Sequence, residues 1–120
     1  MKNILLHLAD DARREVRLRL ALSLAAEHDA RLVGYYVVPT MPYSGFAMAQ
    51  APINVIEGMR QDALGRAAQA ADWFNQAATR QGVTAEYRTG EGDAVALLTD
   101  ASHAADMVIV AQKDRDEVGA

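Results

Sequence analysis

The strongest constraint on the fold is the alternation of short apolar runs with longer segments of helical spacing. Four runs have the length and composition of buried strands: Ile4–Leu8, Leu32–Val38, Val83–Thr89 and Met107–Ala111. Strands that alternate with helices are typical of β-α-β units, which build a parallel sheet covered on both faces. The pattern therefore predicts an α/β protein with a three-layer, Rossmann-like open parallel sheet.

Three helices are expected between the strands, at about 12–28, 54–81 and 94–103. Asp10 and Asp11 precede the first helix, where a carboxylate can cap the N-terminus and meet its positive dipole end. Asp93 stands at the same position before the third helix. Gly82 follows the second helix and is expected to end it.

The polar residues of the strands predict the order of the sheet. Strand 83–89 alternates apolar and charged side chains, which is typical of an edge strand. Right-handed crossovers then give the order 3-2-1-4. Strand 107–111 has no polar protection, so we expect it to be buried on both faces. A charge at Val108 should therefore destroy solubility or folding. A fifth strand, missing here or supplied by a partner chain, would flank it.

A second apolar stripe on the first helix also points to an additional neighbour. Leu18, Ala21, Leu22 and Ala25 form the stripe expected to face the sheet, and Val16, Leu20 and Leu24 lie almost opposite. A helix that covers a sheet needs only one such stripe. The second stripe therefore favours association with another domain or chain.

Length and composition limit the possible functions. The 120 residues are expected to form one domain, incomplete at its C-terminus, with a long flexible loop at 39–52 and a loose tail at 112–120. The net charge of −4 argues against a nucleic-acid partner. The apolar runs are too short to span a membrane. The absence of cysteine and of a leader pattern favours a cytoplasmic location.

Four segments carry a resemblance to a known family: Lys2–Asp10, Glu27–Leu32, Tyr35–Pro39 and Ala105–Val110. In this order and spacing they resemble the universal stress protein family. The resemblance implies a five-stranded α/β fold of order 3-2-1-4-5, which often dimerises through strand 5 and commonly occurs as tandem domains in bacteria. It also implies that the chain corresponds to an N-terminal domain truncated before the family's last helix and strand.

The resemblance further implies where a nucleotide would bind. Nucleotide-binding members place ATP at the carboxyl ends of strands 1, 2 and 4, with an acidic residue after strand 1 and a glycine motif after strand 4. Here Ala9 takes the acidic position beside Asp10, and Val37 matches an adenine-contacting valine. Ala111 and Asp114 replace the first two glycines. A side chain hinders the approach of backbone N–H groups to phosphate, and a carboxylate repels it, so these departures argue against ATP.

Other candidate contacts lie near the crevice expected between strands 1 and 4. His7 is either a half-buried imidazole with a backbone partner or a hydrogen-bond donor to a ligand. Lys113 and Arg115 would attract an anion. The complete candidate set is His7, Ala9, Asp10, Val37, Ala111, Gln112, Lys113, Asp114 and Arg115.

A glycine-containing turn precedes the third helix. Gly90-Glu91-Gly92 follows a strand, as a dinucleotide-binding loop would. It lacks the third glycine, and Glu91 and Asp93 would repel a pyrophosphate. The sequence therefore favours a turn with a helix cap.

Two main functions remain open, beside a third possibility, a regulatory domain of a larger transporter or kinase. The first is a non-enzymatic stress-response module that acts by dimerisation or tandem domain pairing, with a small ligand in the crevice and no resident cofactor or metal. The alternative is an ATP-binding universal stress protein with slow ATP hydrolysis, for which ATP or AMP would be the cofactor. The degenerate segment after strand 4 favours the first function.

Overall fold

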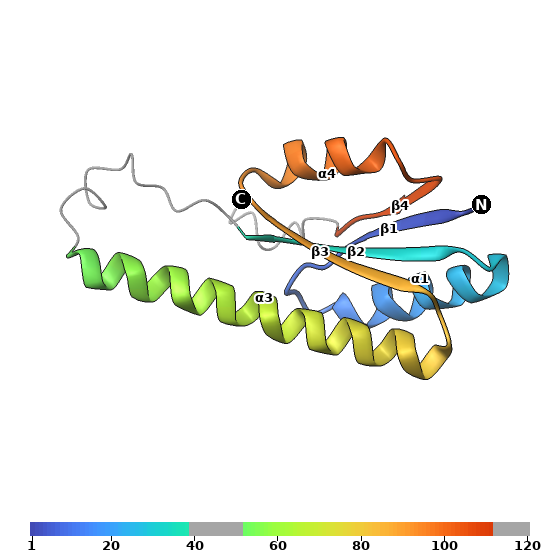
Figure 1. Cartoon of the computed structure of the whole chain (residues 1–120), viewed down its shortest axis with the longest axis horizontal. Coiled ribbons are helices and arrows are strands. Elements are labelled where there is room, and N and C mark those ends of the chain that lie inside the picture. Colours follow the sequence, from blue (N-terminus) through green and yellow to red (C-terminus); the bar gives the residue numbers. More distant parts are fainter. Residues whose placement is uncertain (39–51, 112–120) are drawn as a thin grey trace.

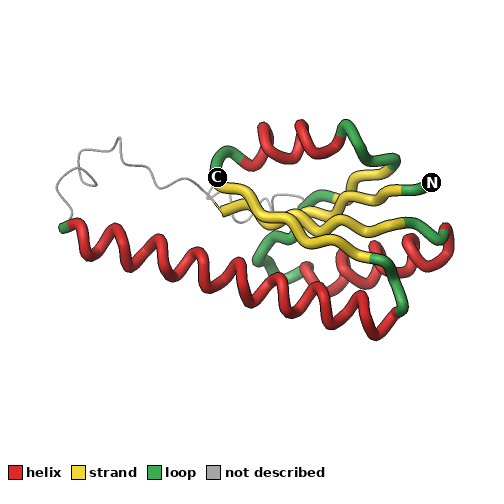
Figure 2. The backbone as a smooth tube through the Cα atoms, in the orientation of Figure 1, coloured by secondary structure: helices red, strands yellow, loops and turns green. Residues whose placement is uncertain are grey.

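A four-stranded parallel sheet lies between helices on its two faces (Figure 1). The computed structural model describes residues 1–38 and 52–111. The elements are β1 (Asn3–His7), α1 (Arg14–His28), β2 (Arg31–Val38), α3 (Ile53–Gln81), β3 (Ala85–Glu91), α4 (Ala94–Ser102) and β4 (Met107–Ile109). Helices α1 and α3 cover one face and α4 covers the other, as Figure 2 also shows. The predicted three-layer α/β architecture is confirmed.

The strands follow the order β3-β2-β1-β4, and every neighbouring pair is parallel. Ile4 of β1 lies opposite Leu32 on one side and Met107 on the other, and Leu32 lies opposite Ala85. The carboxyl ends of all four strands therefore meet at one edge of the sheet. The predicted order 3-2-1-4 is confirmed.

The strands end at different heights along this edge. Strand β1 stops at His7, opposite Tyr35, whereas β2 continues to Val38, opposite Glu91 of β3. On the other side of β1, the short strand β4 stops at Ile109. The end of β1 is therefore set back from the ends of β2 and β3.

The core on the α1 and α3 face is centred on Phe74. This ring is fully buried and lies against Gly34 of β2. A Cβ atom at Gly34 would stand 2.8 Å from both Cε1 and Cζ of Phe74. The absence of a side chain at position 34 therefore allows the ring to sit directly on the strand.

Small residues let α3 approach the sheet closely. Its inward stripe is buried at Ala63, Ala67, Ala70, Phe74 and Ala77. The N-terminal part of α3 extends beyond the sheet (Figure 2), and Met59 is 42% exposed. Within residues 1–38 and 52–111, no helix is both long and apolar enough to cross a membrane.

Two of the predicted helix boundaries are confirmed. The Oδ2 atom of Asp93 accepts a hydrogen bond of 2.9 Å from the Ala96 amide and caps α4. Gly82 ends α3 in the left-handed conformation, with φ of 70°. The two residues therefore act as the cap and stop that their types favour.

The aspartates before α1 differ from expectation. Asp11 accepts a hydrogen bond of 3.0 Å from the amide of Arg13, one residue before the helix begins. Asp10 caps no amide, and its carboxylate accepts a hydrogen bond from the Tyr36 hydroxyl. The side chain of Asp10 is thus directed to the end of the sheet.

The expectation that strand 107–111 is buried on both faces is wrong for the described chain. Val108 is 39% exposed and Val110 is 51% exposed. Helix α4 makes its main contacts with β1 and β2, so β4 is only partly covered. No strand within the described residues pairs with the outer edge of β4.

The second stripe of α1 is also largely exposed. Val16 is 65% exposed and Leu20 is 51% exposed, whereas Leu24 packs against the core. The neighbour inferred for this stripe is not among the described residues. The stripe of Leu18, Ala21, Leu22 and Ala25 is buried against the sheet as expected.

Strand β3 begins two residues later than the sequence indicated. Val83 donates its amide to the carbonyl of Ala78, 3.0 Å away, so it completes the end of α3 before the strand starts. The edge position of β3 is confirmed. The predicted loop, apart from Pro52, and the predicted tail at 112–120 lie outside the described residues.

Candidate functional site

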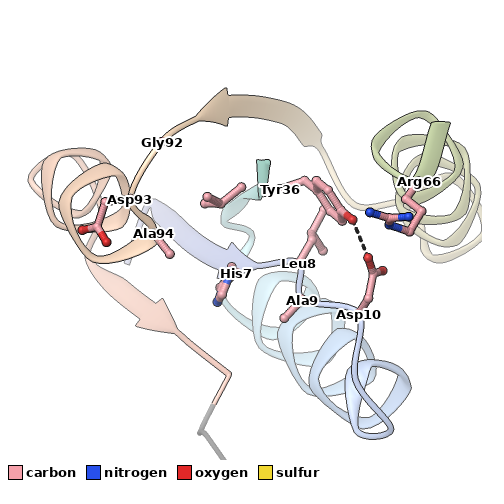
Figure 3. Close-up of a pocket in the computed structure, with 10 residues that line it drawn as sticks. His7, Leu8, Ala9, Asp10, Tyr36, Arg66, Gly92, Asp93 and Ala94 are labelled. Carbon is pink, nitrogen blue, oxygen red and sulfur yellow. Dashed lines mark hydrogen bonds between the residues drawn. The ribbon is translucent and has the colours of Figure 1, made fainter. Parts of the chain in front are cut away.

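A cavity of about 700 Å³ opens at the carboxyl ends of β1 and β2 (Figure 3). It lies over the set-back end of β1, between the start of α4 on one side and α3 on the other. Its walls are His7, Leu8, Ala9, Asp10, Tyr36, Val37, Arg66, Gly92, Asp93 and Ala94. Ligands of open α/β sheets bind at this edge, so the cavity is the first candidate site.

The hydrogen bond between Tyr36 and Asp10 crosses one wall of the cavity (Figure 3). Arg66 of α3 lies on the far side of the Tyr36 hydroxyl. Burial, together with the hydrogen bond to Asp10, raises the pKa of Tyr36 to about 12. The phenol is therefore a fixed donor at neutral pH, and Asp10 keeps lone pairs for another donor.

The loop that carries Asp10 is held from beneath by Arg17. One guanidinium nitrogen of Arg17 lies 2.8 Å from Oδ1 of Asp11 and 3.3 Å from the carbonyl oxygen of Ala9. Partial burial acts to raise the pKa of Asp11, but the hydrogen bonds from Arg17 and the Arg13 amide lower it below its ordinary value. These contacts fix the backbone on both sides of Asp10.

His7 lies at the floor of the cavity, at the end of β1. Burial, and then the positive charge of Arg17, lower the pKa of His7 below its ordinary value of 6.5, against a smaller opposing effect of Asp11. The imidazole is therefore neutral at pH 7. A neutral imidazole has one donor and one acceptor nitrogen, and it can serve either end of a ligand hydrogen bond.

The turn before α4 forms the opposite wall. The amide of Gly92 donates to the carbonyl of Val38, 3.0 Å away, which ties the turn to the end of β2. Gly92 has a φ of 149°, which side chains rarely adopt. Asp93 follows, and its carboxylate already accepts a hydrogen bond from the amide of Ala96 at the helix N-terminus.

The charges in the cavity favour a ligand without several phosphates. Its walls carry the carboxylates of Asp10 and Asp93 and one guanidinium, that of Arg66. The Asp93 carboxylate also takes the helix-terminal position that an anion would need. In the part of the chain that the structure describes, no three His, Cys, Asp or Glu side chains gather as metal ligands would.

The structure brings together four of the residues selected from the sequence. His7, Ala9, Asp10 and Val37 line the cavity. Ala111 does not line it, because the cavity opens over β1 and β2 instead of the crevice expected between β1 and β4. Gln112, Lys113, Asp114 and Arg115 lie outside the described residues. Ligand contact by any of these residues remains a prediction.

Several wall residues were missed. Tyr36 was included only in an apolar strand, although a tyrosine at a strand end is a signal for a hydrogen-bonding wall. Arg66 gave no signal beyond its place beside the alanine stripe of α3. Asp93 was identified only as a cap, and its position at the carboxyl end of β3 could have indicated the site as well.

The fold and the site define a class. This is a doubly wound α/β domain with a ligand-sized cavity at the carboxyl ends of its parallel strands. The model of the universal stress protein family matches residues 1–120. The chain therefore belongs to the universal stress protein family. None of the curated proteins matches the chain.

Solved structures with the same fold include proteins of this family. A universal stress protein family member from Burkholderia pseudomallei is 26% identical, with a TM-score of 0.67 over 92% of this chain and 81% of that chain. The protein UspA from Lactobacillus plantarum is 18% identical, with a TM-score of 0.72 over 95% and 79%. A family member from Arabidopsis thaliana with bound AMP is 12% identical, with a TM-score of 0.55 over 98% and 95%.

Proposed function

We propose that this domain is a non-enzymatic stress-response module that binds a nucleoside or nucleoside monophosphate in the cavity at the ends of β1 and β2. The observation that carries the proposal is the Asp10 carboxylate, which is held by the Tyr36 hydroxyl at the wall of a cavity of about 700 Å³. Family membership supports the stress-response role.

The walls suit a flat, hydroxylated ligand. Leu8, Val37 and Ala94 offer apolar surface for a base, and Asp10 offers an acceptor for a ribose hydroxyl or an exocyclic amine. Arg66 is the one guanidinium in the wall, and it matches a single phosphate. The bound AMP of the Arabidopsis protein supports a ligand of this class.

The same walls argue against a triphosphate and its hydrolysis. Asp93 carries a negative charge at the N-terminus of α4, where backbone amides would otherwise meet phosphate. Ala111 stands where nucleotide-binding members have the first glycine of their motif. We therefore expect binding without turnover, and an affinity for adenosine or AMP above that for ATP.

Pairing with a second domain or chain completes the proposed mode of action. Val108 of the edge strand and Val110 just after it expose apolar surface, and Val16 and Leu20 do so on α1. Exposed apolar patches favour association. A tandem domain or a second copy would cover these side chains and transmit the state of the ligand cavity.

Calorimetric titration with adenosine, AMP and ATP, with and without Mg²⁺, tests the proposal. Adenosine or AMP should bind, and Asp10→Asn should weaken the binding about tenfold because a charge-assisted hydrogen bond is lost. Asp100→Asn, on the exposed end of α4, is the matched control and should bind as the wild type does. Failure of both adenosine and AMP to bind would overturn the proposal.

Slow ATP hydrolysis is the second candidate. The AMP-bound relative favours it, because AMP shares its nucleoside and first phosphate with ATP. Tighter binding of ATP than of AMP, with phosphate released at a rate that Asp10→Asn reduces, would support this candidate over the first.

A further inference from the structure

A second cavity, of about 500 Å³, opens in the groove between α1 and α3, next to the first. The two cavities share Asp10 and Arg66 in their walls. The remaining walls of the groove are Asp11, Arg14, Gln69, Ala70 and Trp73. Each space alone falls within the roughly 300–1,000 Å³ of a pocket for a drug-sized ligand, so the two together offer room for a ligand larger than one nucleoside.

Trp73 presents a fixed aromatic surface in this groove. Its Nε1 donates a hydrogen bond of 3.0 Å to Oε1 of Glu15, and the guanidinium of Arg14 lies 5.1 Å from the ring centroid. The ring is half-buried. Because its one polar atom is already bound, the ring can offer a ligand only flat apolar contact, of the kind on which bases stack. A base that stacks on the face beneath Arg14 would take the place of that guanidinium.

The side chains at the boundary between the two cavities carry a net positive charge. Asp10 lies between two guanidiniums, with Arg14 at 3.6 Å and Arg66 across the Tyr36 hydroxyl (Figure 3). Asp11 is compensated by Arg17 at 2.8 Å. One carboxylate therefore meets two guanidiniums at the junction, which suits a single negative charge on a ligand that passes from one cavity to the other.

We propose that the groove between α1 and α3 is a second binding compartment, and that the site takes a dinucleoside monophosphate. One nucleoside would occupy the cavity at the ends of β1 and β2, so the inference rests on the proposed function. The phosphodiester would contact Arg14 and Arg66 beside the Asp10 carboxylate, and the second base would stack against Trp73. Arg66 and Trp73 are seven residues apart on α3, about 10 Å along the helix axis, which is a reach on the scale of a nucleoside unit.

A merely structural role for Trp73 makes a different prediction. Trp73 packs against the core, so its replacement would lower stability in either case. Packing alone would not make the domain prefer a two-base ligand over a one-base ligand. The ratio of the dissociation constant for a one-base ligand to that for a two-base ligand therefore separates the roles.

The test is a titration of the full chain with adenosine and with adenylyl-(3′→5′)-adenosine. Calorimetry should give a dissociation constant about tenfold or more lower for the two-base probe, from the stacked base and the phosphodiester contacts. Trp73 is the only tryptophan in the sequence, so its fluorescence reports on the groove directly. The two-base probe should change this emission more than adenosine does.

Variants identify the compartment. Trp73→Leu should bring the ratio of the dissociation constants close to one, and Arg14→Gln should lower it severalfold. Arg13→Gln, at an exposed arginine that lines neither cavity, is the matched control and should keep the wild-type ratio. If Trp73→Leu does not fold, Arg14→Gln against Arg13→Gln decides, because these side chains are on the surface.

The outcomes separate this inference from the proposed function. Equal affinities for the two probes, or a preference that survives both variants, would overturn the second compartment while leaving adenosine binding intact. Binding of neither probe would overturn the compartment and the proposed function together.

Discussion

Tyr36 and Asp10 join the buried strand β2 to the loop that follows β1, through a hydrogen bond from the phenol to the carboxylate. The contact exists because β1 ends earlier than β2, so Tyr36 has a strand partner in β3 but none in β1 at this height. The carboxylate is thereby held at the wall of the candidate site.

Tyr36 should ionise at a higher pH than an ordinary tyrosine does. Its pKa is raised to about 12, so the folded state favours the neutral phenol. The corresponding stability is present below pH 10, the ordinary pKa, and is lost as the pH rises toward 12. Subtracting the ultraviolet titration curve of Tyr36→Phe from that of the wild type gives a difference curve for Tyr36, whose midpoint should lie near pH 12. A difference curve with a midpoint at 10 would contradict this environment.

His7 should make the stability of the fold depend on pH in the acidic range. Because its pKa is lowered in the folded state, the unfolded chain binds a proton more readily, and stability should fall as the pH drops below about 6.5. Nitrogen-detected NMR should give a His7 midpoint below 6.5. His7→Gln should flatten the stability profile in this range. A midpoint above 6.5 would mean that the imidazole is solvated or paired with an acid.

Gly34 should be sensitive to the smallest side chain. Gly34→Ala places a Cβ atom against the ring of Phe74, which is fully buried and has no room to retreat. We expect a loss of about 1–3 kcal/mol in the free energy of unfolding. Urea denaturation measures it.

Gly65→Ala is the matched control for Gly34. A Cβ atom at Gly65 meets nothing within 4 Å. Since alanine favours a helix interior, this variant should be more stable than the wild type by about 0.5–1 kcal/mol. Equal effects at positions 34 and 65 would contradict the close approach of Phe74 to β2.

Strand β4 should tolerate a charge on one face only. Ile109 packs against the core, whereas Val108 is 39% exposed. Ile109→Asp should therefore abolish cooperative unfolding, while Val108→Asp should remain folded and lose self-association if this edge is an interface. Urea denaturation and analytical ultracentrifugation distinguish the two effects. Unfolding of both variants would restore the expectation of a strand buried on both faces.

The layers and the strand order could be predicted from the sequence because each rests on local patterns. Apolar runs mark the strands, the charges of Glu86 and Arg88 mark the edge, and right-handed crossovers leave one order. Burial of β4 was predicted wrongly because the position of α4 over β1 and β2 depends on packing between distant segments.

The candidate site was only partly predictable. His7, Ala9 and Asp10 follow from the rule that ligands meet the carboxyl ends of parallel strands. Arg66 reaches the cavity only because α3 lies along the sheet with its alanines inward, and that placement is a property of the packed molecule. Asp10 was interpreted as a cap because its partner, Tyr36, is 26 residues away along the chain.

The most direct test of the proposed ligand site is NMR mapping of adenosine binding on the isotope-labelled chain. The account predicts that shifts concentrate at residues 7–10, 36–37, 66 and 92–94, which line the cavity at the ends of β1 and β2. Shifts gathered at the amino ends of the strands, around Asn3 and Arg31, or no shifts at saturating adenosine, would contradict it.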